Sequence, residues 1–172
     1  MPVWPFKRSK ADADAERLLD AVTQASRQPA LFGEGRIPDT LEGRFELMAL
    51  NASLALIRLR AAPGVETLAQ AFTDKLFRLW DAGLREDGVG DLIVPKKMRK
   101  LAGSFYGRLS AYGEALNSTE ALAGVIARNV FASEAHAFAP ALAAYAARTA
   151  ETQAGSELDA VFTSAGWPDY TG

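Results

Sequence analysis

Few residues of this chain have the types and spacing that catalysis requires. His136 is the only histidine, and no metal ligands or acid–base partners stand near it in a recognisable motif. The absence of cysteine excludes disulfides, thiolate ligands and a cysteine nucleophile. The acidic segment 86–91 lacks the alternating oxygen ligands and the closing glutamate of an EF-hand. Phosphate-binding loops, dinucleotide fingerprints and nucleophile elbows are also missing. We therefore expect no catalytic residue, no metal and no cofactor.

The most informative segment runs from Pro95 to Leu116 and combines lysine, arginine and glycine with an apolar pattern. Projected at 100° per residue, its apolar residues share one arc, which should face the core: Met98, Leu101, Ala102, Phe105, Leu109, Tyr112 and Leu116. The projection places a basic group broadly opposite this arc: Lys96, Lys97, Lys100 and Arg108. Gly103 and Gly107, with Ser110 and Ala111, form a strip of small residues, also away from the arc.

The two glycines need an explanation, because each glycine inside a helix costs about 1 kcal/mol relative to alanine. Either another helix of the same domain packs closely against Gly103 and Gly107, or a partner segment docks there. In the second case the neighbouring lysines could hold an acidic or phosphate group, although a basic run is as often a solvated face. Tyr106 projects to the border between the apolar arc and the small strip, where an amphipathic ring can contact a partner.

The N-terminal arm, residues 1–10, contains a second candidate surface. Trp4 and Phe6 stand beside Lys7 and Arg8, a combination that resembles an interfacial anchor for anionic lipid. A flexible tail without a role is the alternative. No secretory signal follows, and the apolar run 47–57 is too short to span a bilayer. We expect a soluble cytoplasmic protein that can touch the inner face of the cytoplasmic membrane. A net charge of −2 argues against DNA as a partner.

The elements that would position these residues are all helical. With 49% apolar and 23% charged residues, residues 11–172 can form one domain with a single core. Helical periodicity, caps and breakers predict an all-α bundle of about six to seven helices. The expected helices are Asp12 or Asp14 to Arg27, 40–61 capped by Asp39, 65–85, 95–116, 118–131 capped by Asn117 with Glu120, one with Pro140 in its first turn ending near Gly155, and a short one from Ser156. The second of these is apolar around most of its axis, which is typical of a central helix.

Four segments of the chain resemble the ubiquinol–cytochrome c chaperone family. They are FELMALNASLALIRLR from Phe45 to Arg60, FRLWD from Phe77 to Asp81, GVGDLIVPKKMRKLAGSFYGRLSAYGEAL from Gly88 to Leu116, and the tail Gly166-Trp167-Pro168. The similarity covers roughly residues 40–168, and the 88–116 segment is the most specific part of it.

The resemblance implies an all-helical chaperone domain that assists assembly of respiratory complex III, chiefly by binding newly made cytochrome b. It implies no catalytic residues. Ribosome contact and a small partner subunit, found with mitochondrial members, are not expected, because the chain lacks the long N-terminal extension and membrane segment of those relatives. Unassembled cytochrome b exposes apolar surface that would aggregate in water. We hypothesise that a groove beside Gly103 and Gly107, with Tyr106 and flanked by Lys96, Lys97, Lys100 and Arg108, forms part of the client surface.

Two other functions are compatible with the residues. The first is a peripheral membrane or ribosome adaptor whose basic helix binds phosphate groups, and whose binding would weaken steeply with salt. The second is a small helical enzyme acting on an isoprenoid or lipid, which would need a pocket lined by converging acidic residues.

Overall fold

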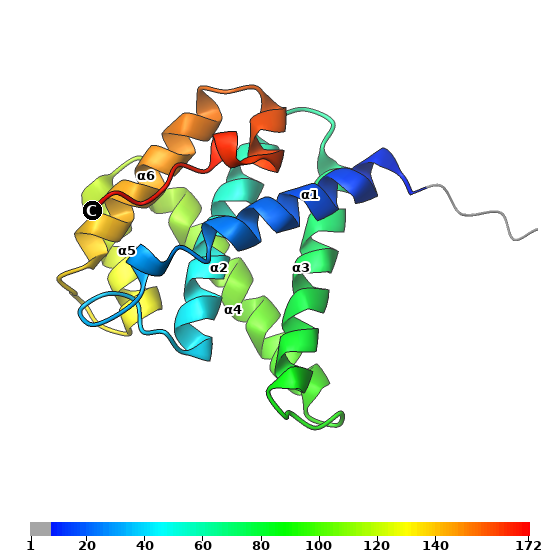
Figure 1. The fold of residues 1–172 in the computed structure, drawn as a ribbon, viewed down its shortest axis with the longest axis horizontal. Helices are drawn as coiled ribbons and strands as arrows, with labels where there is room; N and C mark the ends of the chain where they lie inside the picture. Colours follow the sequence, from blue (N-terminus) through cyan, green and yellow to red (C-terminus); the bar gives the residue numbers. More distant parts are fainter. Residues whose placement is uncertain (1–7) are drawn as a thin grey trace, which may run out of the picture.

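The computed structural model describes residues 8–172, which form six α-helices in one bundle (Figure 1). The helices are α1 Lys10–Ala25, α2 Leu41–Arg60, α3 Glu66–Glu86, α4 Val94–Ala115, α5 Thr119–Phe131 and α6 Ala139–Ala154. Three short 3-10 turns complete the described chain: η1 Pro29–Leu31, η2 Leu158–Phe162 and η3 Ser164–Gly166. No strand occurs among these residues, and a single isolated bridge joins Phe32 and Ile37. The all-α class expected from the sequence is confirmed.

Helix ends differ from the expected ones at several caps. Thr40, and not Asp39, caps α2 by accepting a hydrogen bond from the Gly43 amide, while Asp39 forms an ion pair with Arg44. At α5 the cap is Ser118, one residue after the predicted Asn117. Helix α1 begins at Lys10, earlier than predicted, because the Ser9 hydroxyl accepts from the Asp12 amide. The predicted last helix is shorter and tighter: it is the 3-10 turn η2.

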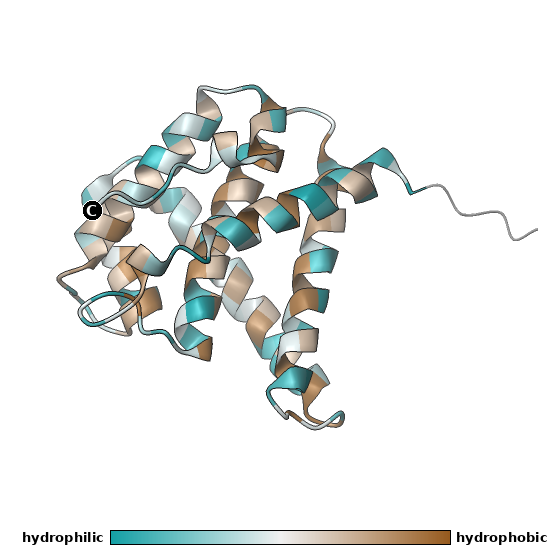
Figure 2. Cartoon of the chain, in the orientation of Figure 1, coloured by the Kyte–Doolittle hydropathy of each residue, from teal (hydrophilic) through white to brown (hydrophobic). Residues whose placement is uncertain are grey.

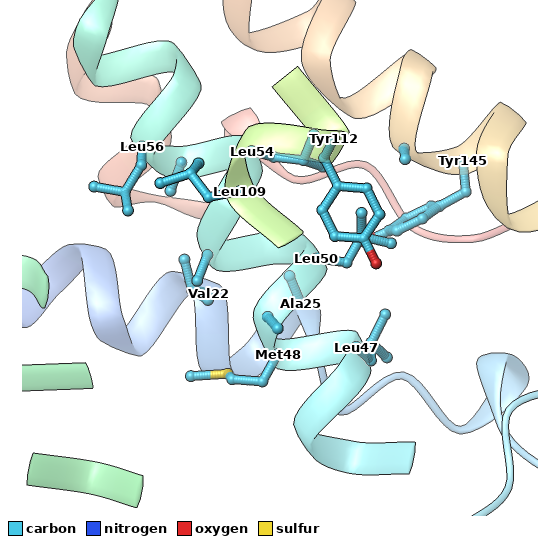
Figure 3. Close-up of a cluster of buried hydrophobic side chains, with 14 of the residues drawn as sticks. Val22, Ala25, Leu47, Met48, Leu50, Leu54, Leu56, Leu109, Tyr112 and Tyr145 are labelled. Atoms are coloured by element: carbon cyan, nitrogen blue, oxygen red, sulfur yellow. The ribbon is translucent and has the colours of Figure 1, made fainter. Parts of the chain in front are cut away.

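Helix α2 lies at the centre of the bundle and contacts each of the other five helices (Figure 1). Its apolar residues surround the axis, so nearly the whole helix between Glu46 and Leu56 is buried. Side chains from α1, α4 and α6 close around it, as Figure 3 shows for Val22, Ala25, Leu109, Tyr112 and Tyr145. The central position predicted for this helix is confirmed.

A buried polar cluster joins the end of α1 to α2, α6 and the C-terminal tail. Asn51, with no exposed surface, donates to the Ser26 hydroxyl at 3.0 Å and accepts from the Tyr145 hydroxyl at 3.5 Å. Gln28 donates to the Tyr145 hydroxyl at 3.3 Å and accepts from the Tyr170 amide at 2.7 Å. Because buried polar groups are costly unless they are paired, this cluster favours one register of these segments.

The tail Gly166-Trp167-Pro168, which supported the family resemblance, is held against the bundle by hydrogen bonds. The Trp167 indole donates to the Val161 carbonyl at 2.9 Å, and Gln153 of α6 donates to the Gly166 carbonyl at 3.0 Å. A β-carbon at Gly166 would lie 2.7 Å from the Ala160 carbonyl oxygen, so only glycine fits this close approach. These contacts close the C-terminal segment over η2 and α6.

Helices α3 and α4 form an antiparallel pair whose connecting turn, residues 87–93, projects from one end of the molecule (Figure 1). Gly88 ends α3 with a φ of +86°, a conformation that glycine adopts without strain. Figure 2 shows hydrophobic residues at this projecting end. The glycines and lysines of α4 lie on the outer face of this helix pair.

Candidate binding face on helix α4

Gly103 and Gly107 lie on the outer face of α4 and are open to solvent. Both residues are exposed, and a β-carbon built at either glycine would meet no atom within 4 Å outside the helix's own nearby backbone. Intramolecular helix packing, one of the two explanations for the glycines, is therefore not what these residues do within the described domain. Their backbone is available for close approach by another molecule.

The three lysines of the candidate face are fully solvated. Lys96, Lys97 and Lys100 are exposed, and none of them makes a salt bridge with another residue in the range 8–172. They stand in the first two turns of α4, before the glycines. Their positive charge is thus free to act on an external anion.

Tyr106 links the outer face of α4 to the neighbouring helix α3. The residue is 48% exposed, yet its ring packs edge-on against Phe77 of α3 at a centroid distance of 5.9 Å. Phe105 and Trp80 extend the same aromatic cluster inward, 5.4 Å apart. This packing fixes the tyrosine ring while one side of it remains accessible.

Arg108 does not join the lysines, in contrast to the predicted arrangement. Its guanidinium makes two hydrogen bonds to the Glu46 carboxylate of α2, at 2.6 and 2.7 Å, and only 20% of its side chain is exposed. Arg108 lies two turns after Leu101 and one turn before Tyr112, so it stands at the edge of the apolar arc, where its long side chain reaches α2. Burial raises the pKa of Glu46, and the hydrogen bonds and charge of Arg108 offset part of that rise.

Two hollows lie along α3, on the α4 side of the pair. One, of about 370 Å³, lies between the end of α2, the start of α3 and Tyr106; its lining includes Leu56, Arg60, Val65, Ala69 and Thr73. The other, of about 630 Å³, is lined by Asp74, Phe77, Arg78, Asp81 and Met98. Gly103 and Gly107 line neither hollow; helix α4 contributes Tyr106 to the first and Met98 to the second. Sequence reasoning missed the α3 side, although the segment 77–81 was part of the resemblance.

The N-terminal candidate surface is described in part. Trp4, Phe6 and Lys7 lie outside the described residues. Arg8 forms ion pairs with Asp12 and Glu16, both on α1. A hydrogen bond from Lys75 is the main cause that lowers the pKa of Asp12, and Arg8 adds to it. Within residues 8–172, no helix is both long enough and apolar enough to cross a bilayer.

His136 stacks on the ring of Phe131, with centroids 3.7 Å apart and planes within 2°. Its Nδ1 accepts a hydrogen bond from the Phe138 amide at 3.1 Å, which places the imidazole in the turn between α5 and α6. Across the described part of the chain, no three acidic or histidine side chains gather in a way that could hold a metal ion. The histidine therefore has a structural contact and no ligand set.

Comparison with known proteins places this architecture in a family. The family model described as "Ubiquinol-cytochrome C chaperone" matches residues 34–165. The crystal structure of the Cbp3 homolog from Brucella abortus is similar over 95% of this chain and 92% of that chain, with 37% sequence identity and a TM-score of 0.79. Among curated proteins none matches significantly. The matched region includes α2 to α6, and so the whole candidate face.

Proposed function

The chain belongs to the ubiquinol–cytochrome c chaperone family, and from that premise we propose that it is a non-catalytic chaperone for assembly of the ubiquinol–cytochrome c reductase complex, and that its client is newly made cytochrome b. Family membership supports the assembly role. The client and the face that binds it are proposals argued from the residues of α4.

The exposed glycine pair is the observation on which the binding face depends. Gly103 and Gly107 together cost about 2 kcal/mol of helix stability relative to alanine, and no contact within the described domain offsets this cost. A surface that is bare at two successive turns allows another helix to approach the backbone closely, as small residues do between packed helices. An apolar client helix would gain contact area there that side chains at these positions would deny it.

The residues around the pair suit an apolar client with charged ends. Tyr106 offers an ordered aromatic surface at one edge of the strip, next to the hollow of about 370 Å³. Lys96, Lys97 and Lys100 stand beyond the strip, where they can pair with acidic or phosphate groups that flank an apolar segment. Binding then requires no cofactor, because shielding an apolar surface from water is itself favourable.

Capture of cytochrome b by glycine-to-leucine variants tests the face. Gly103→Leu with Gly107→Leu fills the bare strip, and we expect at least a tenfold loss of cytochrome b recovered in a pull-down from membranes. The circular dichroism spectrum should match that of the unmodified protein and the unfolding temperature should be equal or higher, because both sites are open and leucine favours a helix more than glycine does. The matched control is Ala121→Leu with Ala144→Leu, which adds two leucines to exposed positions of α5 and α6. Equal capture by the glycine variant and the control would exclude the proposed face.

A further inference from the structure

The turn between α3 and α4 presents the most exposed large hydrophobic side chain of the described structure. Leu92 is 94% exposed and the adjacent Ile93 is 50% exposed. Both lie at the projecting end of the α3–α4 pair, where the residues before α4 are hydrophobic (Figure 2). Single exposed apolar residues are common on protein surfaces, but Leu92 and the adjacent Ile93 together form an exposed apolar tip at an extremity of the molecule.

This tip is held in place by an ordered turn. The amides of Ile93 and Val94 both bond to the Gly90 carbonyl, at 2.9 and 3.1 Å, and the Val94 side chain is completely buried. On the other side of the turn, Arg85 of α3 forms ion pairs with Asp81 and with Asp91. The backbone that carries the two apolar side chains is thus ordered, so little backbone conformational entropy is lost when they bind.

Positive charge lies directly behind the apolar tip. Lys96, Lys97, Arg99 and Lys100 are all exposed and make no salt bridge with a described residue. At 1.5 Å per residue they follow Ile93 by roughly 5 to 10 Å along α4. Residues 85–100 carry five cations against three carboxylates, in a chain whose net charge is −2. One of these carboxylates, Asp91, is already paired with Arg85. The segment 85–100 thus carries a net charge of +2, although Glu86 and Asp87 of the same segment are exposed as well.

We propose that the α3–α4 turn docks on an anionic lipid surface, with Leu92 and Ile93 in the boundary between headgroups and acyl chains and Lys96, Lys97 and Lys100 on the lipid phosphates. The spacing of the two groups matches the depth of that boundary, which interfacial segments enter by about 5–10 Å. A projecting apolar tip fits a soft, deformable layer, whereas a protein partner would have to supply a pocket for it. The proposal does not depend on cytochrome b capture by the glycine face.

A fluorophore at the tip provides the first test. Because the chain has no cysteine, Leu92→Cys can be labelled with an environment-sensitive dye at one position. We expect a blue shift with vesicles that contain phosphatidylglycerol, none with phosphatidylcholine alone, and reversal by high salt. Glu134→Cys, an exposed position in the turn between α5 and α6, should report no shift. A shift that grows with protein concentration without vesicles would indicate a second copy on the tip, and it would overturn the proposal.

Co-sedimentation of the otherwise unmodified chain with the same vesicles provides the second test. Leu92→Ser should weaken binding about tenfold, because burial of a leucine side chain is worth at least that factor. Lys96→Ala with Lys97→Ala should weaken it about twenty-five-fold, at roughly fivefold per lysine. Arg128→Ala, which removes an exposed cation from α5, is the control and should bind normally.

Two results of the sedimentation assay would refute lipid docking by the tip. One is undiminished binding of Leu92→Ser. The other is binding that is lost entirely in Trp4→Ser with Phe6→Ser, because the N-terminal arm would then account for it alone. Since the assay contains no cytochrome b, either result leaves the proposed client face unaffected.

Discussion

Arg108 of α4 and Glu46 of α2 form a two-bonded, partly buried ion pair between the two helices, with donor–acceptor distances of 2.7 Å from Nε and 2.6 Å from Nη2. The Glu46 side chain is 11% exposed and that of Arg108 is 20% exposed. The guanidinium also lies over the ring of Phe45, 5.7 Å from its centroid. The planar fork of arginine matches the carboxylate in one relative position of the two helices, so the pair favours the register in which α2 supports the candidate face.

Arg108→Ala should lower the free energy of unfolding by about 2–3 kcal/mol, because it leaves the buried Glu46 carboxylate without a partner. The double variant Glu46→Met with Arg108→Met should recover most of that loss, since two apolar side chains of similar length have no charge to desolvate. Urea unfolding at pH 7 measures both. A double variant as unstable as Arg108→Ala would contradict this account of the pair.

Tyr112→Phe should leave the stability unchanged or raise it by up to about 1 kcal/mol. Tyr112 is completely buried, and its hydroxyl makes no hydrogen bond of ordinary geometry with a described residue, although the Asn129 side chain lies close enough to favour its charged form. By contrast, Tyr145→Phe should cost about 1 kcal/mol, because that hydroxyl bonds to Asn51 and Gln28. Thermal unfolding of the two variants at pH 7 gives the comparison. A larger loss for Tyr112→Phe than for Tyr145→Phe would show that the Tyr112 hydroxyl is bonded.

The same tyrosine predicts a pH dependence in the alkaline range. Burial raises the pKa of Tyr112 above the ordinary value of 10.0, so the folded state retains a proton that the unfolded state releases. The stabilisation is complete below pH 10 and is lost as the pH rises beyond it. The unmodified protein should therefore lose stability relative to Tyr112→Phe between pH 10 and 11.5. If the free energies of unfolding of the two proteins changed in parallel over that range, the expected rise in the pKa of Tyr112 would be contradicted.

The helices could be predicted from the sequence because their signals are local. Apolar periodicity placed α2 at the centre, and proline and glycine marked the limits of α3, α4 and α6. Caps were predicted less well, since Asp39 and Thr40, or Asn117 and Ser118, are neighbours that can both cap a helix. Which of the two neighbours caps the helix depends on whether one of them bonds to another residue, as Asp39 does with Arg44.

The candidate face was predictable in composition and only partly in geometry. The projection of α4 separated Gly103 and Gly107 from the apolar arc, and both are exposed. It could not show that Glu46, 62 positions earlier in the chain, would draw Arg108 inward, because that depends on the packing of α2 against α4. Nor could it show that the hollows lie against α3. The exposure of Leu92 likewise follows from the packing of α3 on α4, which no local pattern records.

Replacing either of two helical glycines, Gly43 and Gly103, with alanine should change the free energy of unfolding in opposite directions. Gly43 of α2 lies against the backbone of Pro38, and a β-carbon there would stand 1.9 Å from the Pro38 carbonyl oxygen. Gly43→Ala should therefore lower the free energy of unfolding by at least about 2 kcal/mol, because the backbone must move. Gly103→Ala meets open space and should raise it by up to about 1 kcal/mol. Chemical denaturation compares them, and a loss of stability for Gly103→Ala would mean that the strip is packed in the folded protein.

Salt dependence separates client capture from a role as a phosphate-binding adaptor. If an apolar segment of cytochrome b lies on Gly103 and Gly107, recovery of cytochrome b should change less than threefold between 50 and roughly 500 mM salt, because apolar burial is insensitive to ionic strength. A basic helix that acts through Lys96, Lys97 and Lys100 alone would lose most of its binding, since exposed charges are screened within about 10 Å at 0.1 M salt. The informative variant is Lys96→Ala with Lys97→Ala and Lys100→Ala, assayed for cytochrome b capture at both salt concentrations. If this variant retains capture and Gly103→Leu with Gly107→Leu abolishes it, the binding energy comes from the bare backbone strip. The reverse result would assign the binding energy to the lysines and favour the adaptor.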